Sequence, residues 1–185
     1  ERVAVAILKV SQRLGGIAAG AYDAEGGLAG FVFGMTGVQE GQIVHWSDML
    51  AVRRDLQDAG LGALLKAYQR EELITRGVMR MYWTFDPLEA KNAHFNLNKL
   101  GAVAGEYVRD MYGGTDSPLH RGIGTDRFVP TWAMDSPRVT ERLVEGRAGP
   151  DPGADQGAKR TFVVQREGGL DLPAEPDLSI EADRL

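Results

Sequence analysis

The 185-residue sequence contains no cysteine. This absence excludes disulfide bonds, a thiol nucleophile and cysteine-ligated zinc or iron–sulfur clusters. No apolar run approaches the roughly 20 residues that a membrane-spanning helix needs, and no signal-peptide pattern opens the sequence. No Asn-x-Ser/Thr glycosylation site occurs either. Together these absences predict a cytoplasmic protein that makes no contact with a membrane.

Basic residues are in the minority, since 21 Lys and Arg face 26 Asp and Glu, for a net charge of -5 at pH 7. Nonspecific binding to nucleic acid depends on a basic face, so no nucleic-acid partner is expected. Histidine is scarce as well, with 3 residues. Their spacing matches neither H-x-x-x-H nor H-E-x-x-H, so no metal site is expected.

The pattern of apolar residues and turns predicts an α/β (α+β) fold. Helices are expected at 4–14, 60–75 and 89–100, and strands at 16–22, 28–35, 43–52, 78–85, 103–111 and 127–132. The first two strands should form an antiparallel hairpin. The strand–helix–strand order across 43–85 implies a parallel pair with a right-handed crossover. We therefore expect a mixed sheet, antiparallel in its N-terminal part and parallel at its centre, with helices on both faces.

The helix expected at 60–75 is predicted from the spacing of its apolar residues. Leu61, Leu64, Leu65 and Tyr68 stand at positions i, i+3, i+4 and i+7. This spacing is typical of an amphipathic helix.

The chain is predicted to divide into a domain at 1–132 and an extension at 133–185. Within the extension, residues 147–159 are rich in Gly, Pro, Asp and Gln, a composition typical of a flexible linker. Residues 161–165 could form a strand beyond this linker. Such a strand could pair with the sheet edge of a second copy, which would make the protein a homodimer.

The stretch Gln57-Asp58-Ala59-Gly60-Leu61-Gly62 follows a predicted strand and opens an amphipathic helix. Backbone N–H groups at a helix start lack partners within the helix and suit a phosphate. Glycine allows a phosphate to approach the backbone closely. The dinucleotide fingerprint G-x-G-x-x-G is not matched, because Leu65 stands at its third glycine, and no P-loop is present. The alternative is a helix start with glycines and no ligand.

The pattern Gln57-x-x-Gly60-x-Gly62 resembles the acetyl-CoA signature of the GCN5-related N-acetyltransferases, Gln/Arg-x-x-Gly-x-Gly/Ala. The segment 92–101 resembles the later helix of that family, which bears Asn and ends in Lys-x-Gly. The runs 83–88 and 125–132 resemble a bacterial subgroup of predicted acetyltransferases. The resemblance covers about 15–132. It implies the family's fold and an N-acyltransferase that uses acetyl-CoA, or another acyl-CoA, as co-substrate and a small-molecule amine as acceptor.

The resemblance also implies roles for individual residues. Those expected to bind the co-substrate are Val52, Gln57, Asp58, Ala59, Gly60, Leu61, Gly62, Asn92 and Asn96. Asn92 and Asn96 share a helix face, which would meet the pantetheine arm; the alternative is a solvated polar face. The backbone N–H of Leu50, or of a neighbour, would stabilise the oxyanion. Arg53 and Arg54 could meet the outer phosphates or could be plain surface charges.

A base must take a proton from the attacking amine. The candidates are His45, Asp48, Asp86, Glu89 and His94. His45 and Asp48 are preferred because they lie on the strand beside the expected thioester. They are three residues apart, so strand alternation places them on opposite faces of the sheet and only one can face the site. A bound water without a dedicated base is the alternative.

Two features depart from the family pattern. The family fold usually begins with a strand and two helices, whereas one helix precedes the hairpin here, so an N-terminal strand and helix are expected to be missing. Leu97 stands where many members place a Tyr that is proposed to protonate the departing CoA thiolate. Tyr107 or Tyr112 could replace that Tyr. Both departures favour the alternative function, a CoA-binding module with little or no catalysis.

Overall fold

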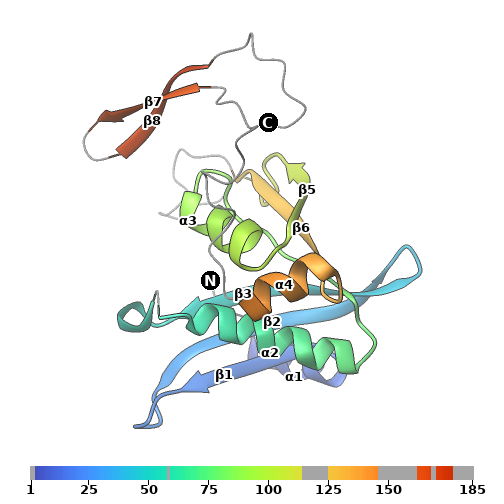
Figure 1. The fold of residues 1–185 in the computed structure, drawn as a ribbon. Helices are drawn as coiled ribbons and strands as arrows, with labels where there is room; N and C mark the ends of the chain where they lie inside the picture. Colours follow the sequence, from blue (N-terminus) through green and yellow to red (C-terminus); the bar gives the residue numbers. More distant parts are fainter. Residues whose placement is uncertain (1–2, 58, 114–124, 146–161, 168–169, 177–185) are drawn as a thin grey trace. The chain divides into compact units, whose positions relative to one another are not determined.

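The structure is a computed structural model that describes residues 3–57, 59–113, 125–145, 162–167 and 170–176. The chain forms two compact units, Glu1–Gly149 and Pro150–Leu185. The first unit contains, in chain order, α1 (Val5–Arg13), β1 (Ile17–Tyr22), β2 (Leu28–Gln39), β3 (Gln42–Val52), the 3-10 helix η1 (Arg54–Leu56), α2 (Leu61–Thr75), β4 (Arg80–Tyr82), α3 (Ala90–Ala93), the π-helix η2 (His94–Lys99), β5 (Val103–Val108), β6 (Arg127–Ala133) and α4 (Pro137–Glu145) (Figure 1). None of the described helices is long and apolar enough to cross a membrane.

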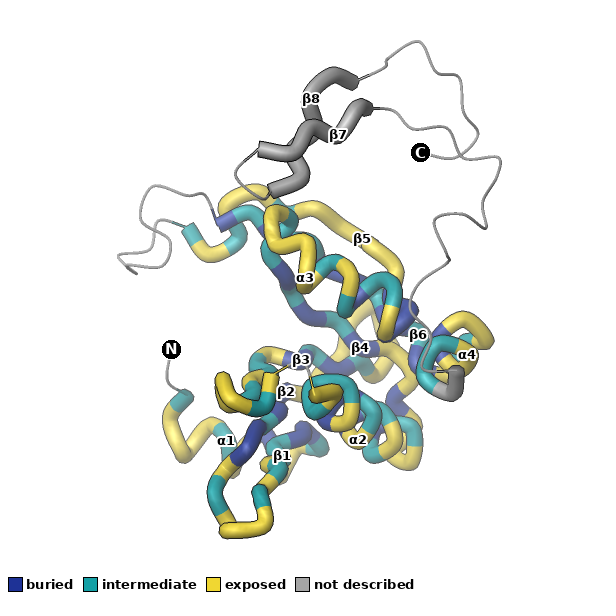
Figure 2. Tube along the Cα trace, turned by 60° about the vertical axis from the view of Figure 1, so that its left-hand side comes forward, coloured by how far each residue is buried: buried dark blue, intermediate teal, exposed yellow. Residues whose placement is uncertain are grey.

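Six strands of the first unit form one mixed sheet in the order β1-β2-β3-β4-β6-β5. β3 and β4 pair in parallel, and the other neighbours pair antiparallel. Figures 1 and 2 together show α1 on one face of strands β1 to β3 and α2 on the other. The predicted mixed sheet with helices on both faces is therefore confirmed.

Two tryptophans hold the centre of the core. Trp132 on β6 is fully buried and meets Trp83 edge to face, with 5.7 Å between the ring centroids. The indole N–H of Trp132 donates to the carbonyl oxygen of Leu100 at 2.7 Å, which ties the end of η2 to the sheet. In Figure 2 the buried residues gather along the central strands, whereas the outer strand β5 is exposed. This core fixes the helices that surround the candidate site.

The helix predicted at 60–75 is present as α2, and its buried face is partly polar. Its buried residues are Leu65, Lys66, Gln69 and Leu73, whereas Leu64 and Tyr68 are 66% and 47% exposed. Lys66 and Gln69 hydrogen-bond to side chains of β3, so the core accepts two polar residues that the apolar pattern assigns to solvent.

The first unit extends beyond the boundary predicted at residue 132. Val139 of α4 is 1% exposed, and the guanidinium of Arg138 donates to the carbonyl oxygen of Gly101 at 3.0 Å. These contacts attach α4 to the end of η2, so α4 belongs to the first unit. The predicted linker at 147–159 lies outside the described residues.

The second unit contains an antiparallel pair, β7 (Phe162–Glu167) and β8 (Leu170–Pro176). The strand predicted at 161–165 is therefore present, and it pairs with β8. Homodimer formation through this strand remains a prediction. It is tested by measuring the solution mass of the full chain and of a chain that ends at residue 149. An equal subunit number in both would contradict it.

Candidate functional site

β3 and β4 separate after a short run of pairing. Trp46 and Tyr82 form the last pair, and β3 then continues along β2 to Val52. A bulge marks the separation, because Phe33 pairs with Met49 and Gly34 with Ser47, which leaves Asp48 as an extra residue. The extra residue changes the alternation of the strand. As a result, Ser47 before the bulge and Leu50 after it line the same cavity.

The free edge of β3 presents backbone N–H groups. The N–H of Arg53 donates to the carbonyl oxygen of Ala29 on the β2 side at 2.8 Å. Because N–H groups alternate between the two edges of a strand, those of Leu50 and Val52 point away from β2. They therefore point toward the opening between β3 and β4, where the family resemblance implies an oxyanion donor.

A groove of about 330 Å³ lies between the end of β3, the start of α2 and the helix formed by α3 and η2. We call it the helix-start groove. The predicted co-substrate residues that line it are Val52, Gln57, Gly60, Gly62 and Asn92. Ala59 and Leu61 belong to the same turn but do not line the groove, and Asp58 lies outside the described residues.

The start of α2 is open to a ligand. Gly60 is the N-cap residue, with φ 86°, and no side-chain hydrogen bond caps the helix. Few residues other than glycine adopt this left-handed conformation. A Cβ at Gly62 would lie 3.8 Å from the ring of Phe95 and 3.9 Å from the side chain of Leu50. The missing Cβ therefore keeps the groove wide beside the uncapped N–H groups.

Two cations line the helix-start groove. Lys91 and Lys99, on the helix formed by α3 and η2, line it. Arg53 instead pairs with Asp23 at 2.7 Å and Asp55 at 2.8 Å, and Arg54 does not line it. The sequence held a signal for the two lysines, since both flank Asn92 on the segment that resembles the family's later helix.

A second cavity of about 360 Å³ lies at the separation of β3 and β4, and we call it the split cavity. It shares Leu50, Asn92 and Phe95 with the helix-start groove, so the two spaces adjoin. Asn92 and Asn96 both line it, as their spacing predicts. Asn96 is buried in η2, and its side-chain oxygen accepts the indole N–H of Trp83 at 3.0 Å.

Only one of the two preferred bases lines the split cavity. Asp48 lines the split cavity. His45 is fully buried outside that lining, and its ring nitrogens lie 3.1 Å from Thr36 Oγ1 and 3.0 Å from Gln69 Nε2. Burial, with a smaller effect from Lys66, lowers the pKa of His45 to about 3. His45 is therefore a neutral structural residue, and Asp48 is the member of the pair that reaches the cavity.

The remaining proton-transfer candidates lie in different places. Asp86 lines the split cavity, and one of its oxygens accepts the N–H of Leu88 at 2.9 Å. His94 lines the helix-start groove. Glu89 is the N-cap residue of α3. Asp86 is therefore the other predicted carboxylate that the structure brings to the cavity beside Asp48.

Neither tyrosine considered as a proton donor lines the split cavity. Tyr107 donates to the carboxylate of Asp126, and this bond raises the pKa of the phenol. The hydroxyl of Tyr112 lies 2.8 Å from Thr84 Oγ1, and Thr84 does line the cavity. Tyr112 is therefore one hydrogen bond away from the site, whereas Tyr107 is held elsewhere.

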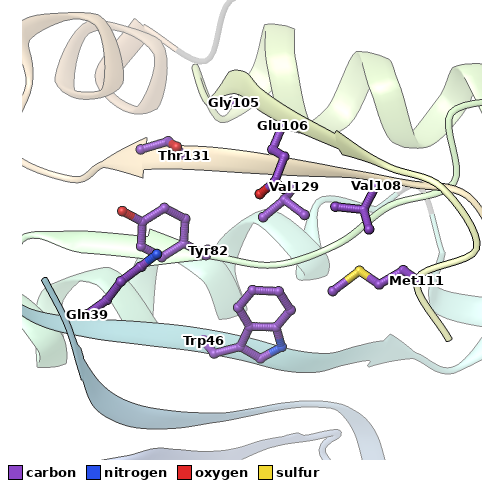
Figure 3. Close-up of a pocket in the computed structure, with 9 residues that line it drawn as sticks. All are labelled: Gln39, Trp46, Tyr82, Gly105, Glu106, Val108, Met111, Val129 and Thr131. Carbon is purple, nitrogen blue, oxygen red and sulfur yellow. The ribbon is translucent and has the colours of Figure 1, made fainter.

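A third cavity, of about 440 Å³, lies on the face of the sheet opposite α2 (Figure 3). Its floor holds Trp46 and Tyr82, the last pair before β3 and β4 separate. Strand alternation turns Trp46 away from His45 and Ser47, both of which bond to residues of α2. Glu106 on β5 and Met111 also line this space, which we call the aromatic cavity.

Comparison with solved structures identifies proteins with a similar fold. Naa20 from Chaetomium thermophilum, in complex with a bisubstrate analogue, has a TM-score of 0.60 and 15% identity over 84% of this chain and 83% of its own. A GNAT family acetyltransferase from Elizabethkingia anophelis with acetyl-CoA bound has a TM-score of 0.57 and 13% identity over 70% and 83%. The ribosomal-protein-S18-alanine N-acetyltransferase from Escherichia coli has a TM-score of 0.56 and 20% identity over 74% and 80%.

The chain has the fold of the GCN5-related N-acetyltransferases. No protein-family model and no curated protein matches the sequence, so the likeness rests on the structure. The fold resemblance inferred from Gln57 to Gly62 is confirmed. In this GNAT fold, β3 and β4 are the parallel pair that separates, and α2 begins at the glycine-bearing turn.

Sequence reasoning missed several residues of these spaces. They are Ser47, Lys66 and Arg127 of the split cavity, and Trp46, Tyr82 and Glu106 of the aromatic cavity. Lys66 left no usable signal, because a pattern of apolar residues assigns a lysine to solvent.

Proposed function

We propose that the protein is an acyl-CoA-dependent N-acyltransferase that transfers an acyl group, with acetyl the expected one, to the amine of a small molecule. The observation that carries the proposal is the junction of the helix-start groove with the split cavity at the free edge of β3. The uncapped start of α2, the helix-start groove and the polar split cavity follow one another there. This order matches the parts of acetyl-CoA, from pyrophosphate to thioester.

The co-substrate has a natural place along this path. Its pyrophosphate would accept N–H groups from the first turn of α2, where the helix dipole is positive, with Lys91 and Lys99 beside it. The pantetheine arm would pass Asn92 and Phe95. The thioester oxygen would then meet the N–H of Leu50, a donor placed for the oxyanion that forms in acyl transfer.

The acceptor amine would approach from the aromatic cavity on the opposite face. Its volume of about 440 Å³ lies within the range of small-molecule sites. A cation is attracted to the faces of Trp and Tyr rings, and the carboxylate of Glu106 adds a negative charge (Figure 3). These features support a small cationic amine as the acceptor.

The proposal is tested by binding and by turnover. Acetyl-CoA at 100 times Kd should stabilise the fold by about 2.7 kcal/mol, which for this size corresponds to a rise in Tm of about 5–10 °C. NAD should give no rise. Cationic amines should then release CoA thiol from acetyl-CoA. A rise in Tm with acetyl-CoA but no thiol release with any amine would favour the alternative, a CoA-binding module. The absence of both the rise in Tm and the thiol release would contradict both functions.

Glu106→Gln should weaken acceptor binding selectively. Loss of one exposed ion pair costs about 0.2–1 kcal/mol of binding free energy. The KM for a cationic amine should therefore rise by up to about fivefold. KM for acetyl-CoA and kcat should stay near their wild-type values. Glu71→Gln, at an exposed position on α2, is the matched control. An unchanged amine KM in Glu106→Gln would place the acceptor outside the aromatic cavity.

A further inference from the structure

Lys66 is a buried amine that the proposed function does not yet use. Its residue exposure is 2%, yet it lines the split cavity. Nζ lies 2.7 Å from Ser47 Oγ, 3.6 Å from Met81 Sδ and 4.0 Å from the ring centroid of Trp83. All three groups are uncharged. A buried ammonium without a paired carboxylate is costly, and no ion pair of Lys66 occurs among the described residues.

A directed chain of hydrogen bonds holds Nζ in place. Each group donates to the next: Lys66 Nζ to Ser47 Oγ, Ser47 Oγ to Gln69 Oε1, Gln69 Nε2 to His45 Nε2, His45 Nδ1 to Thr36 Oγ1, and Thr36 Oγ1 to the carbonyl oxygen of Gly15. The directions follow because the hydroxyl proton of Thr36 is used on Gly15, which assigns the proton of His45 to Nδ1. Ser47 uses its own proton on Gln69. The chain therefore positions Nζ but offers it no base.

The surroundings of Lys66 allow it to change charge near neutral pH. Burial lowers the pKa of its amine to about 7. The charged groups that line the same cavity are Asp48 from β3, Asp86 after β4 and Arg127 from β6. His45 lies beyond Gln69 in the hydrogen-bond chain. His45 is neutral, and Arg127 lies 3.8 Å from Asp86. The Nζ amine can therefore accept and release one proton near neutral pH.

We propose that Lys66 is a catalytic proton shuttle that takes the proton of the attacking amine nitrogen and returns it to the departing CoA sulfur. This inference rests on the proposed function. The amine nitrogen forms a bond to the thioester carbonyl carbon, and its proton passes to neutral Nζ. The carbon–sulfur bond then breaks, and the thiolate takes that proton from the Nζ ammonium. The products are the amide and CoA thiol, and Lys66 ends neutral as it began.

The location of Lys66 suits both transfers. Lys66 lines the split cavity from α2, and Ser47 and Leu50 line the same cavity from β3. The predicted oxyanion donor, the N–H of Leu50, therefore belongs to a residue of the same cavity wall. Leu97, at the position where the resemblance expects a proton-donating Tyr, has no proton to give. A single lysine that both accepts and returns a proton removes the need for a separate acid.

The test uses the full chain with acetyl-CoA and a cationic amine found to release CoA thiol. Lys66→Met keeps an unbranched side chain of similar length that cannot accept a proton. Lys66→Arg carries a permanent positive charge and cannot release a proton at neutral pH. Both should lower kcat by about 10²–10⁴, the usual contribution of acid–base catalysis. The rise in Tm with acetyl-CoA should persist in both. Lys9→Met, at an exposed position on α1, is the matched control.

The pH profile separates a shuttle from a packing residue. Because neutral Nζ must accept the first proton, wild-type kcat should rise with pH through a midpoint near 7 and then level off. This rising limb should vanish in Lys66→Met. If the wild type is active and Lys66→Met keeps both its kcat and the rise of kcat with pH, this inference alone is overturned. A wild type that releases no CoA with any amine overturns the proposed function and this inference together.

A mass measurement distinguishes a shuttle from a nucleophile. The protein incubated with acetyl-CoA alone should show no acetyl group on Lys66. Acetylation of Lys66 would make Nζ an acyl acceptor and would overturn the shuttle, because an amide nitrogen no longer accepts a proton at neutral pH. The two lysines that line the helix-start groove, Lys91 and Lys99, serve as internal references for nonenzymatic acetylation.

Discussion

Gly62→Glu should abolish the binding of acetyl-CoA while the protein stays folded. The new side chain would enter the helix-start groove from a point 3.8 Å from Phe95 and 3.9 Å from Leu50. It would also place a carboxylate where the pyrophosphate is expected. A loss of at least about 100-fold in affinity, or 2.7 kcal/mol, should remove most of the rise in Tm that acetyl-CoA causes.

The same substitution should leave the fold intact for a physical reason. A carboxylate in the first turn of a helix interacts favourably with the helix dipole, so α2 should keep or slightly gain stability. Two controls separate the effects of volume and charge. Gly62→Ala adds a Cβ at ordinary contact distances, and Gly37→Glu adds the same charge at an exposed position of β2 with nothing within 4 Å. Undiminished stabilisation of Gly62→Glu by acetyl-CoA would place the co-substrate elsewhere.

Local patterns were sufficient to predict the frame of the site. The strand–helix–strand order across 43–85 fixes the parallel pair because a parallel connection needs a crossover. Gly60 and Gly62 mark the start of α2 because both precede an amphipathic run. The helix from residue 89 to 100 was likewise visible in its spacing. Each of these signals lies within about 40 residues of sequence.

The chemistry of the split cavity could not be predicted in the same way. The bulge at Asp48 depends on how β3 pairs with β2, and no local pattern specifies it. Without knowledge of the bulge, strand alternation puts His45 and Asp48 on opposite faces of the sheet and does not decide which of them faces the site. Lys66 and Gln69 have polar side chains, so a pattern of apolar residues assigns them to solvent. Only their hydrogen bonds to β3 place them in the core.

The aromatic cavity illustrates a second limit of prediction from the sequence. Trp46, Tyr82 and Glu106 come from β3, β4 and β5, three strands that the sheet order brings together on one face. Burial of an aromatic residue and a place at the wall of a cavity produce the same sequence pattern. The two are distinguished only when the neighbouring strands and their separation are known.

Gly34→Ala should destabilise the fold strongly, because Gly34 faces the hydrogen-bonded His45. A Cβ at Gly34 would overlap His45 Nε2 and would lie 2.6 Å from the carbonyl oxygen of Trp46. Overpacking costs about 1–3 kcal/mol, and loss of a buried hydrogen bond costs about 1–3 kcal/mol more. We therefore expect the free energy of unfolding to fall by about 2–6 kcal/mol in urea titrations, from the 5–15 kcal/mol typical of domains.

The control for this effect lies on the same strand. Gly37→Ala meets nothing within 4 Å and should change the unfolding free energy by less than about 0.5 kcal/mol, as surface substitutions usually do. Gly34→Ala combined with His45→Ser frees space for the new methyl group and should recover part of the loss. Since the hydrogen-bond chain from Thr36 to Lys66 passes through His45, Gly34→Ala should also displace Nζ and lower kcat at temperatures where the variant remains folded. Wild-type stability and kcat in Gly34→Ala would show that the close contact of β2 with His45 supports neither the fold nor the position of Lys66.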